Sequence, residues 1–360
     1  MPDTEIPNWL REDSGPERRP FAGPGGERPT LSVVVPCFNE EQVLPELLKR
    51  VIKQLDGFRG TSELVLVNDG SNDATWRMMT QAASADARVL CVNLSRNHGH
   101  QTALTAGLTL ARGERVFILD ADLQDPPELL AAMMDRMDEG FDVVYGKRRR
   151  RAGDTAFKVV TARWFYRLIE SMSDTAIPRD AGDFRLMSRR SVDVLLSMPE
   201  RHRFIRGMVS WIGFPQAAFE YDRDPRFAGE TKYPLRKMIA FAKDAMTGFS
   251  VKPLTFATKL GTVSVAVACG VVGYAIWSWL FLDTTPGWTS VVSVVAFFGG
   301  VQLIVLGVMG EYLGRLYEES KGRPLFVIQD VVRGAGDTQE APMPEIVVRQ
   351  SSAEDAAAGR

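Results

Sequence analysis

The stretch LSVVVPCFNEE, residues Leu31–Glu41, decides the fold of the N-terminal half. It opens with a β-branched apolar run that ends at Pro36, which is typical of a strand buried on both faces. Apolar residues then recur with a helical period as far as Leu55, so a helix is expected over residues 40–55. A doubly buried strand followed by a helix belongs to a parallel sheet.

The same alternation continues along the chain. Further strands are expected at 63–67, 88–94 and 115–119, with helices at 73–83 and 101–111 between them. Repeated strand–helix units favour right-handed crossovers, and so predict an α/β fold. We therefore expect a Rossmann-like, mostly parallel sheet with helices on both faces, whose ligands bind at the carboxyl ends of the strands.

Three of the expected strand ends carry polar loops. These loops are Pro36–Glu41, Asn68–Asp73 and Asp120–Pro127. Turn and helix-cap chemistry alone explains one such loop. Three acidic loops on one edge instead need a cation or hydrogen-bond donors to relieve their mutual repulsion, which favours a binding site.

The third loop suggests a cation. Asp120 and Asp122 flank the small Ala121, so both carboxylates can approach one hard ion, either Mg²⁺ or Mn²⁺, that also grips a diphosphate. Asp69, in the second loop, is placed to accept a hydrogen bond from a base or ribose. The sequence contains neither a GxxxxGK[ST] loop nor a GxGxxG fingerprint, which weakens ATPase and dinucleotide-binding interpretations.

Two long apolar runs lie near the C-terminus. The first, Leu260–Leu282, has 23 residues without a charge, and the second extends from Thr284 to Gly310. A helix of the first length reaches roughly 35 Å, enough for a hydrocarbon core of about 30 Å. Two transmembrane helices over 259–310 are therefore expected, the alternative being a buried hairpin of a soluble protein. Basic residues flank the hairpin but not its turn, which places both ends in the cytoplasm.

Composition sets the remaining limits. Of 360 residues, 45% are hydrophobic and 24% charged, and the net charge of −2 argues against nucleic acid as a partner. Three separated cysteines form no zinc or disulfide pattern. The expected division is a disordered tail (1–29), a cytoplasmic catalytic domain (30–233), amphipathic interfacial helices (234–258), two transmembrane helices (259–310), a cytoplasmic segment (311–330) and a second disordered tail (331–360).

Five motifs together resemble family 2 glycosyltransferases of the GT-A fold. They are VVVPCFNEE (33–41), VNDGSNDAT (67–75), LSRNHGHQTALTAGL (94–108), DADLQDPPE (120–128) and GDFRLMSRR (182–190). The chain is most similar to the polyprenyl-phosphate glycosyltransferases. These include dolichyl-phosphate mannose synthases and the bacterial undecaprenyl-phosphate (bactoprenol) glucosyltransferases, which share the C-terminal hairpin.

The resemblance implies a reaction. One sugar passes with inversion from a nucleotide sugar, UDP-glucose or a related UDP-hexose, to undecaprenyl phosphate, with a divalent metal. It also implies a multi-pass protein of the inner (plasma) membrane and a homo-oligomer. The alternatives are a GDP-mannose-using enzyme, a processive polysaccharide synthase and a non-enzymatic scaffold. The processive class lacks support, because Val160 stands where its Gln-x-x-Arg-Trp signature has glutamine.

Motif matching carries the family's site residues onto this chain. Nucleotide-sugar contacts fall on Pro36, Asn39, Glu41, Asp69, Asp120 and Ala121. Metal ligands fall on Asp120, Asp122 and Gln124, and catalytic roles on Asp122, Asp183 and Arg185, with Asp183 orienting the acceptor. Acceptor-phosphate contacts fall on Arg185, Arg226 and Lys232.

Several features of the sequence each allow two interpretations. The basic run Lys147–Arg151 suits either two reacting anions or an anionic membrane surface. Amphipathic stripes over 157–172 and 235–249 fit either membrane-surface helices or helices packed on the sheet. His100 fits either a nucleotide contact or a hydrogen bond at the start of a helix.

Overall fold

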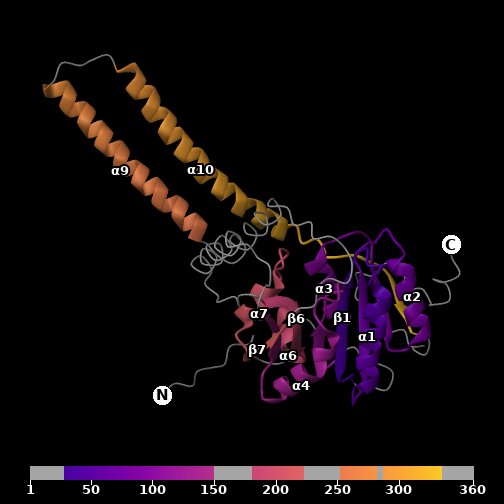
Figure 1. The fold of residues 1–360 in the computed structure, drawn as a ribbon. Helices are drawn as coiled ribbons and strands as arrows, with labels where there is room; N and C mark the ends of the chain where they lie inside the picture. The colour runs from indigo at the N-terminus through magenta and orange to yellow at the C-terminus, as the bar shows by residue number, and fades with distance from the viewer. Residues whose placement is uncertain (1–27, 150–180, 223–251, 282–286, 335–360) are drawn as a thin grey trace, which may run out of the picture.

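The computed structural model describes residues 28–149, 181–222, 252–281 and 287–334 (Figure 1). Within them, strands form one eight-stranded sheet in the order β7-β5-β6-β4-β1-β2-β3-β8. The strands are β1 (Leu31–Cys37), β2 (Ser62–Asn68), β3 (Val89–Leu94), β4 (Arg115–Ile118), β5 (Val143–Arg148), β6 (Ala181–Ser188), β7 (Gln216–Tyr221) and β8 (Ile328–Arg333).

The centre of the sheet is parallel, as expected. β1 pairs in parallel with β2 and β4, and β2 pairs in parallel with β3. Every residue of β1 is buried, because successive side chains of a strand point to opposite faces of the sheet and helices cover both faces. β6 is antiparallel to β4 and β5, so the sheet is mixed toward that edge.

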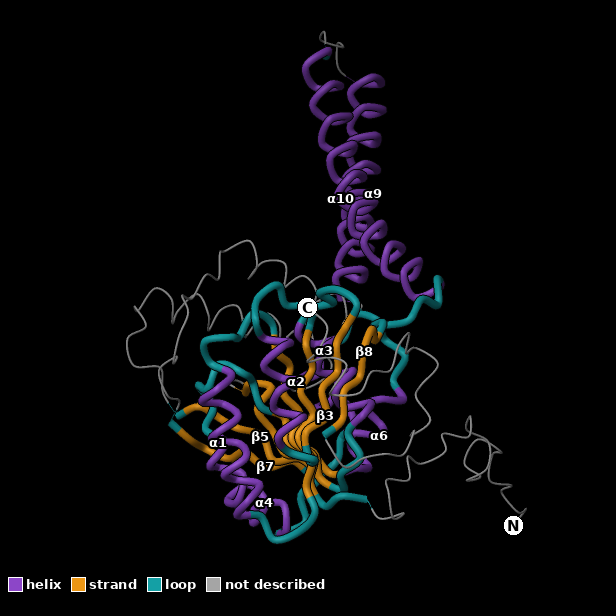
Figure 2. Tube along the Cα trace, turned by 90° about the vertical axis from the view of Figure 1, so that its right-hand side faces the viewer, coloured by secondary structure: helices purple, strands orange, loops and turns teal. Residues whose placement is uncertain are grey.

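Helices cover both faces of the sheet (Figure 2). One apolar layer contains α1 (Leu44–Gly57), α2 (Thr75–Ala85) and α4 (Leu130–Asp138), the last entered through the short 3₁₀ helix η2 (Pro127–Leu129). The opposite layer contains α3 (His100–Leu110), α6 (Arg189–Ser197) and α7 (Ile205–Ile212). Alternate residues of β1 supply the two layers, with Val33 and Val35 on one side and Val34 on the other. The expected α/β fold is therefore confirmed.

α3 lies very close to the sheet at Gly107. A Cβ built there would lie 2.5 Å from Val34 Cγ1 and 2.9 Å from Val67 Cγ2. We expect Gly107→Ala to destabilise the protein by about 1–3 kcal/mol through overpacking. Gly57→Ala, at the end of α1 with nothing within 4 Å, is the matched control and should change stability little. Thermal unfolding checks both, and equal melting temperatures would contradict the close packing of α3.

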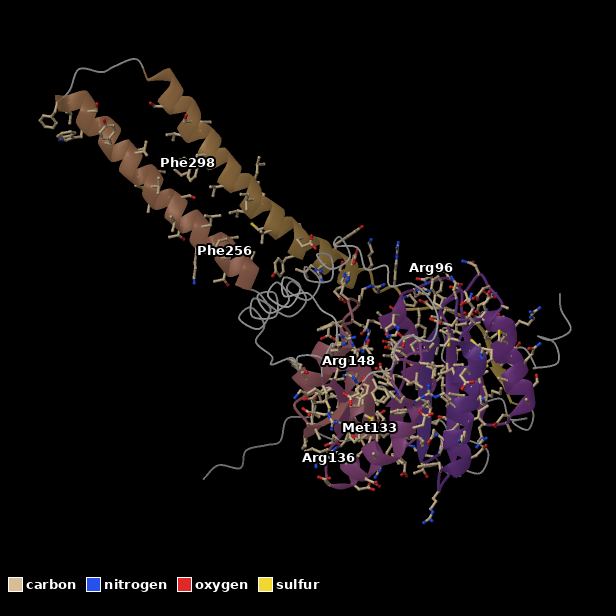
Figure 3. All side chains as sticks on the ribbon, viewed as in Figure 1. Arg96, Met133, Arg136, Arg148, Phe256 and Phe298 are labelled. Atoms are coloured by element: carbon tan, nitrogen blue, oxygen red, sulfur yellow. The ribbon has the colours of Figure 1, made fainter. Side chains whose placement is uncertain are left out.

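Two long helices form a hairpin beyond the sheet. α9 (Lys252–Phe281) and α10 (Trp288–Ser320) run side by side away from the catalytic domain (Figures 1 and 2). Phe256 and Phe298 project from them (Figure 3). Both helices are long and apolar enough to cross a membrane, and almost none of either apolar window is buried. A buried soluble hairpin would hide these side chains, so the geometry favours membrane association.

The hairpin helices extend beyond the expected transmembrane range. α9 begins at Lys252, so residues 252–258 belong to it rather than to a separate interfacial helix. α10 continues to Ser320, well into the segment expected to follow the membrane. The rest of the expected interfacial region, residues 234–251, lies outside the described residues, as does the stripe over 157–172.

β8 corrects the expected C-terminal boundaries. Residues 331–333, expected to begin a disordered tail, complete this strand, which pairs antiparallel with β3. Val331 and Val332 are buried, and Asn93 Nδ2 donates to Asp330 Oδ2 at 3.1 Å. The sheet therefore includes chain from beyond the hairpin, so the expected domain that ends at residue 233 lacks one of the strands of this sheet.

Candidate active site

Antiparallel pairing brings two distant carboxylates together. In the β4–β6 ladder, Ile118 lies opposite Arg185. Asp120 comes two residues after Ile118, and Asp183 two residues before Arg185, so both emerge at the same place on the sheet edge. That edge holds the carboxyl ends of the parallel strands, where α/β sheets bind ligands.

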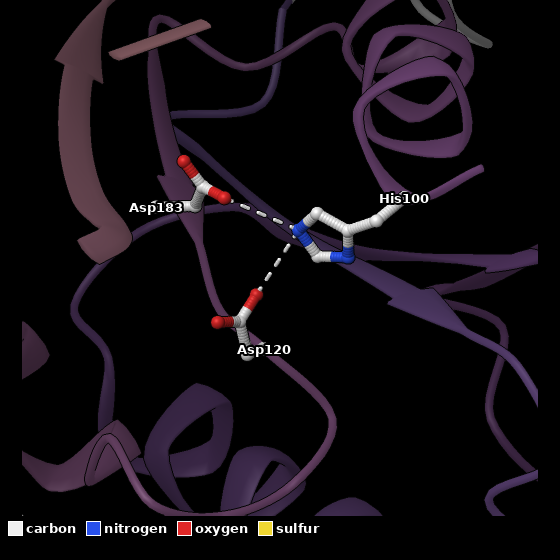
Figure 4. Close-up of side chains that lie close together, drawn as sticks. All are labelled: His100, Asp120 and Asp183. Carbon is white, nitrogen blue, oxygen red and sulfur yellow. Dashed lines mark ion pairs between the residues drawn. The ribbon is translucent and has the colours of Figure 1, made fainter. Parts of the chain in front are cut away.

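His100 joins the two aspartates from the start of α3. Its Nε2 lies 3.4 Å from Asp120 Oδ1 and 3.3 Å from Asp183 Oδ2 (Figure 4). The Asp183 side chain is 3% exposed and that of Asp120 is 22% exposed, whereas His100 is 43% exposed. The cluster is therefore buried at one end and open at the other.

The three groups have strongly shifted pKa values. Burial opposes the charge on His100, but its hydrogen bond to Asp183 and the two carboxylate charges raise its pKa to about 9. Burial would raise the pKa of Asp183, but Arg206, His100 and Arg185 together hold it well below its usual range. Burial and the neighbouring carboxylates raise the pKa of Asp120 to about 6, against the attraction of His100. The charged form of Asp120 is thus less favourable than that of an ordinary aspartate, and an approaching cation would favour it.

The donor set of this cluster fits a divalent cation. One ligand atom from each of His100, Asp120 and Asp183 lies within 4.8 Å of the others. Asp120 Oδ1 is buried and has no hydrogen-bond partner in the described part of the chain. Carboxylate oxygens suit Mg²⁺ and Mn²⁺, and imidazole favours the transition metal of the two.

This group overlaps only in part with the expected metal ligands. Asp120 belongs to both sets, but Asp122 and Gln124 are not in the His100 cluster. Asp122 Oδ1 instead accepts a hydrogen bond from the Gln124 backbone N–H at 3.1 Å. The metal-binding roles of Asp122 and Gln124 stay predictions.

Asp183 is held by donors from two helices. Gln101 Nε2 donates to its Oδ2 at 2.9 Å, and Arg206 Nε donates to its Oδ1 at 2.9 Å. Arg185, expected to contact the acceptor phosphate, is 3% exposed, and its guanidinium donates to the carbonyls of Gly182 and Asp183. Burial lowers the pKa of Arg185 to about 10, so it stays charged at neutral pH.

The second polar loop is packed against the loop after β3. Asp69 is 3% exposed and accepts backbone hydrogen bonds from His98 at 2.7 Å and Gly99 at 2.9 Å. Gly70 has a φ of +69°, and a Cβ there would lie 2.6 Å from the backbone of Arg96 and Asn97. Burial raises the pKa of Asp69 against those two N–H donors. These contacts fix the second polar loop against the loop after β3, and the nucleotide-contact role of Asp69 stays a prediction.

The first polar loop is tied to the second. Asn39, with a φ of 56°, accepts from Asn72 N–H, and its own N–H donates to Ser71 Oγ. The Glu41 carboxylate accepts from the backbone of Ala74, which makes it a helix-capping group here. The other expected contacts are buried, Pro36 within β1 and Ala121 at 5% exposed. The nucleotide-contact roles of these residues stay predictions.

The expected acceptor-phosphate residues are only partly described. Arg226 and Lys232 lie outside the described residues, as do the last two residues of the basic run. Within that run, Lys147 pairs with Glu220 at 2.7 Å. Arg148 lies 4.0 Å from the buried Asp125.

Arg206 and Gln101 were not anticipated from the sequence. The sequence signal concerned only Asp183: the GDFRL motif alternates polar and apolar residues as a strand does, so it could pair antiparallel with 115–119 and bring Asp183 to Asp120. His100 was expected either as a nucleotide contact or as a residue that forms a hydrogen bond at the start of a helix. It is the first residue of α3, and the structure also places it between the two aspartates, while the nucleotide contact stays a prediction.

Comparison with known proteins agrees with these motifs. The profile described as "Glycosyl transferase family 2" matches residues 32–196. An uncharacterized glycosyltransferase of Bacillus subtilis, YkcC, is 45% identical over 299 residues, covering 83% of this chain and 93% of the relative. The chain belongs to glycosyltransferase family 2. It is thus a glycosyltransferase, with a mixed α/β sheet and a C-terminal helical hairpin.

Other family 2 relatives carry more specific names. The prophage bactoprenol glucosyl transferase homolog of Escherichia coli K12 is 38% identical over 308 residues, 84% of this chain and 99% of the relative. The bactoprenol glucosyl transferase of Shigella phage SfV is 38% identical over 306 residues, 83% and 98% respectively. Glucosyl-3-phosphoglycerate synthase of Mycobacterium tuberculosis, solved with Mn²⁺ and UDP-glucose, is 20% identical, with a TM-score of 0.40 over 61% of this chain and 78% of that one. That last similarity is too low to support an argument.

Proposed function

We propose that this family 2 enzyme transfers one hexose, with inversion, from a UDP-sugar to a membrane polyprenyl phosphate in a metal-dependent reaction. The supporting observation is the cluster of His100, Asp120 and Asp183 at the ligand-binding edge of the sheet. UDP-glucose and undecaprenyl phosphate are the preferred substrates, because two relatives aligned over 98–99% of their own length are named bactoprenol glucosyl transferases.

The donor side of the site is acidic. A divalent cation at Asp120, Asp183 and His100 would offset the charge that develops on the departing nucleoside diphosphate. Asp120 has a buried oxygen without a hydrogen-bond partner in the described chain, so it is the residue best placed to bind such an ion. Asp69 and its loop are the candidate contacts for base and ribose.

The acceptor side must bring two anions together. A phosphate monoester has its second pKa near 6, so its oxygen is already nucleophilic at about pH 7 and needs no strong base. Both oxygens of Asp183 already accept from Gln101 and Arg206. This favours an orienting role for Asp183, which holds the guanidinium of Arg206 beside the site.

The hairpin supplies membrane anchorage in this proposal. We infer that α9 and α10 cross the bacterial inner (plasma) membrane and that the catalytic domain is cytoplasmic, because basic residues flank the hairpin outside its turn. The acceptor phosphate cannot leave the headgroup layer, so an anchored catalytic domain meets it there. Assembly into a homo-oligomer remains a prediction.

A substrate panel tests the proposal. The purified full chain with Mg²⁺ or Mn²⁺ should transfer label from UDP-glucose to undecaprenyl phosphate, giving one hexose per lipid by mass spectrometry. Parallel reactions with UDP-galactose, UDP-N-acetylglucosamine, GDP-mannose and dolichyl phosphate define selectivity. Failure with every donor–lipid pair would contradict the proposal, and a polymeric product would indicate a processive synthase instead.

A further inference from the structure

The end of α10 contacts the catalytic domain outside the active site. His202 Nε2 donates to Glu318 Oε2 at 2.6 Å, and the Arg201 backbone N–H donates to Glu319 Oε1 at 2.8 Å. The Arg201 guanidinium also donates to the carbonyl of Arg323, just past the helix end. These contacts join the last turn of a membrane helix to the loop between α6 and α7.

Two acidic side chains in the last turn of α10 make these contacts. Glu318 and Glu319 each accept one hydrogen bond from the 201–202 segment, so carboxylates rather than the terminal helix carbonyls bind the loop. The His202 and Glu318 side chains are 40% and 53% exposed, respectively. Exposed pairs contribute little to folding stability, so a positional role accounts for this arrangement better than a stabilising one.

The loop between α6 and α7, which contacts α10, is held in place by one of its own residues. Arg203 is 8% exposed and donates to the carbonyls of Met198 at 3.0 Å and Leu195 at 2.6 Å. These bonds cap the C-terminal end of α6 and hold the loop to it. The loop is therefore held to the end of α6 up to the point where α7 begins at Ile205.

The first turn of α7 reaches Asp183 by two routes. The Ile205 backbone N–H donates to Gln101 Oε1 at 3.0 Å, and Gln101 Nε2 donates to Asp183 Oδ2 at 2.9 Å. The next residue, Arg206, donates directly to Asp183 Oδ1 at 2.9 Å. A continuous series of hydrogen bonds and rigid backbone thus links the end of α10 to the buried carboxylate.

We propose that Glu318 and Glu319 are positioning residues that hold the 201–206 segment and thereby orient Asp183 and Arg206 toward the acceptor. This inference rests on the proposed function, since it assigns the orientation to the acceptor side of that same site. The donor-side loops at Asp69 and Asn39 make no contact in this series within the described residues.

The double variant Glu318→Ala/Glu319→Ala tests the inference kinetically. The expected result is a kcat/KM for the lipid acceptor that falls roughly 10- to 100-fold, because small misplacements of positioning groups cost this much. The UDP dissociation constant, measured without a divalent ion, should stay within about twofold, because the loops at Asp69 and Asn39 lie outside this series. Glu200→Gln is the control, because Glu200 lies in the same loop but shows no hydrogen bond or ion pair to α10 among the described residues.

A second acceptor distinguishes misorientation of Asp183 from loss of bilayer anchorage. A water-soluble short-chain isoprenyl phosphate should lose the same factor as membrane-bound undecaprenyl phosphate, because the defect lies in the orientation of Asp183. Loss confined to the membrane-bound acceptor would overturn the proposal in favour of simple bilayer anchorage. Wild-type rates with both acceptors would also overturn it.

Backbone hydrogen exchange gives a readout that needs no activity. The Ile205 amide, which donates to Gln101, should exchange faster in the double variant than in the wild type or in Glu200→Gln. Unchanged Ile205 protection would overturn the positioning role even if no lipid is glycosylated. A wild type inactive on every lipid, with faster Ile205 exchange in the variant, would refute the proposed function while retaining the link from α10 to α7.

Discussion

Replacing Asp120 with Asn should slow sugar transfer by about 10²–10³-fold, the usual effect of removing one group that stabilises developing charge. Asp120 Oδ1 is buried without a hydrogen-bond partner in the described chain and lies 3.4 Å from His100, so its charge serves the site rather than the fold. The assay is initial-rate transfer to undecaprenyl phosphate. The control, Asp138→Asn, removes a 60% exposed carboxylate paired with Arg115 and should leave the rate unchanged.

The same substitution should not lower stability. The pKa of Asp120 is raised from 3.8 to about 6, so the folded protein binds this proton more tightly than the unfolded chain does. The contribution of this group to stability is therefore present below about pH 4 and is lost as the pH rises through about 6. At neutral pH with EDTA, Asn at this position avoids that loss, and the melting temperature should stay equal or rise. A large drop in melting temperature would attribute the lost activity to unfolding and contradict this account.

Glu63→Ala should produce the largest loss of stability, about 3–5 kcal/mol, because it breaks a largely buried ion pair with Arg112 and leaves Ser32 Oγ and the Arg112 N–H without their acceptor. Glu63 is 3% exposed and lies at the edge of the sheet opposite the site. Its Oε1 accepts from Ser32 Oγ at 2.5 Å and from the Arg112 backbone N–H at 2.6 Å, and its Oε2 accepts from Arg112 Nε at 3.0 Å. This network joins β1 and β2 to the turn after α3.

Thermal unfolding of the full chain measures that loss. A reduction of roughly 10 °C is expected from Glu63→Ala at this domain size. Glu139→Ala is the control, because Glu139 forms an exposed ion pair with Arg136 on α4, and such pairs contribute at most about 1 kcal/mol. Similar melting temperatures for the two variants would show that the Glu63 network contributes no more than a surface pair.

The parallel half of the fold was predictable because local pattern and burial agree there. The apolar run before Pro36 lies between two helical layers, so burial on both faces was visible in the composition of β1. β8 was not predictable, because the short run Ile328–Arg333 shows no regular alternation of polar and apolar residues and pairs with β3, more than 200 residues earlier in the chain. Its pairing depends on where the hairpin returns the chain.

The sequence predicted which edge of the sheet holds the candidate site, but it predicted only some of the residues that form the site. Asp120 and Asp69 follow strands, so their place depends on local sequence and parallel topology. The approach of Asp183 to Asp120 depends on antiparallel register between β4 and β6, which no single segment encodes. Arg206 reaches Asp183 from α7, a tertiary contact without a local pattern. The missed residues are thus those placed by long-range pairing.

Binding of Mn²⁺ in the presence of UDP, followed by electron paramagnetic resonance on the full chain, tests the central claim most directly. The account predicts that the wild type and Asp138→Asn bind the ion and that Asp120→Asn loses most of this affinity, because Asp120 supplies a buried oxygen that accepts no hydrogen bond within the described residues. Equal Mn²⁺ affinity in Asp120→Asn and the wild type would contradict the account.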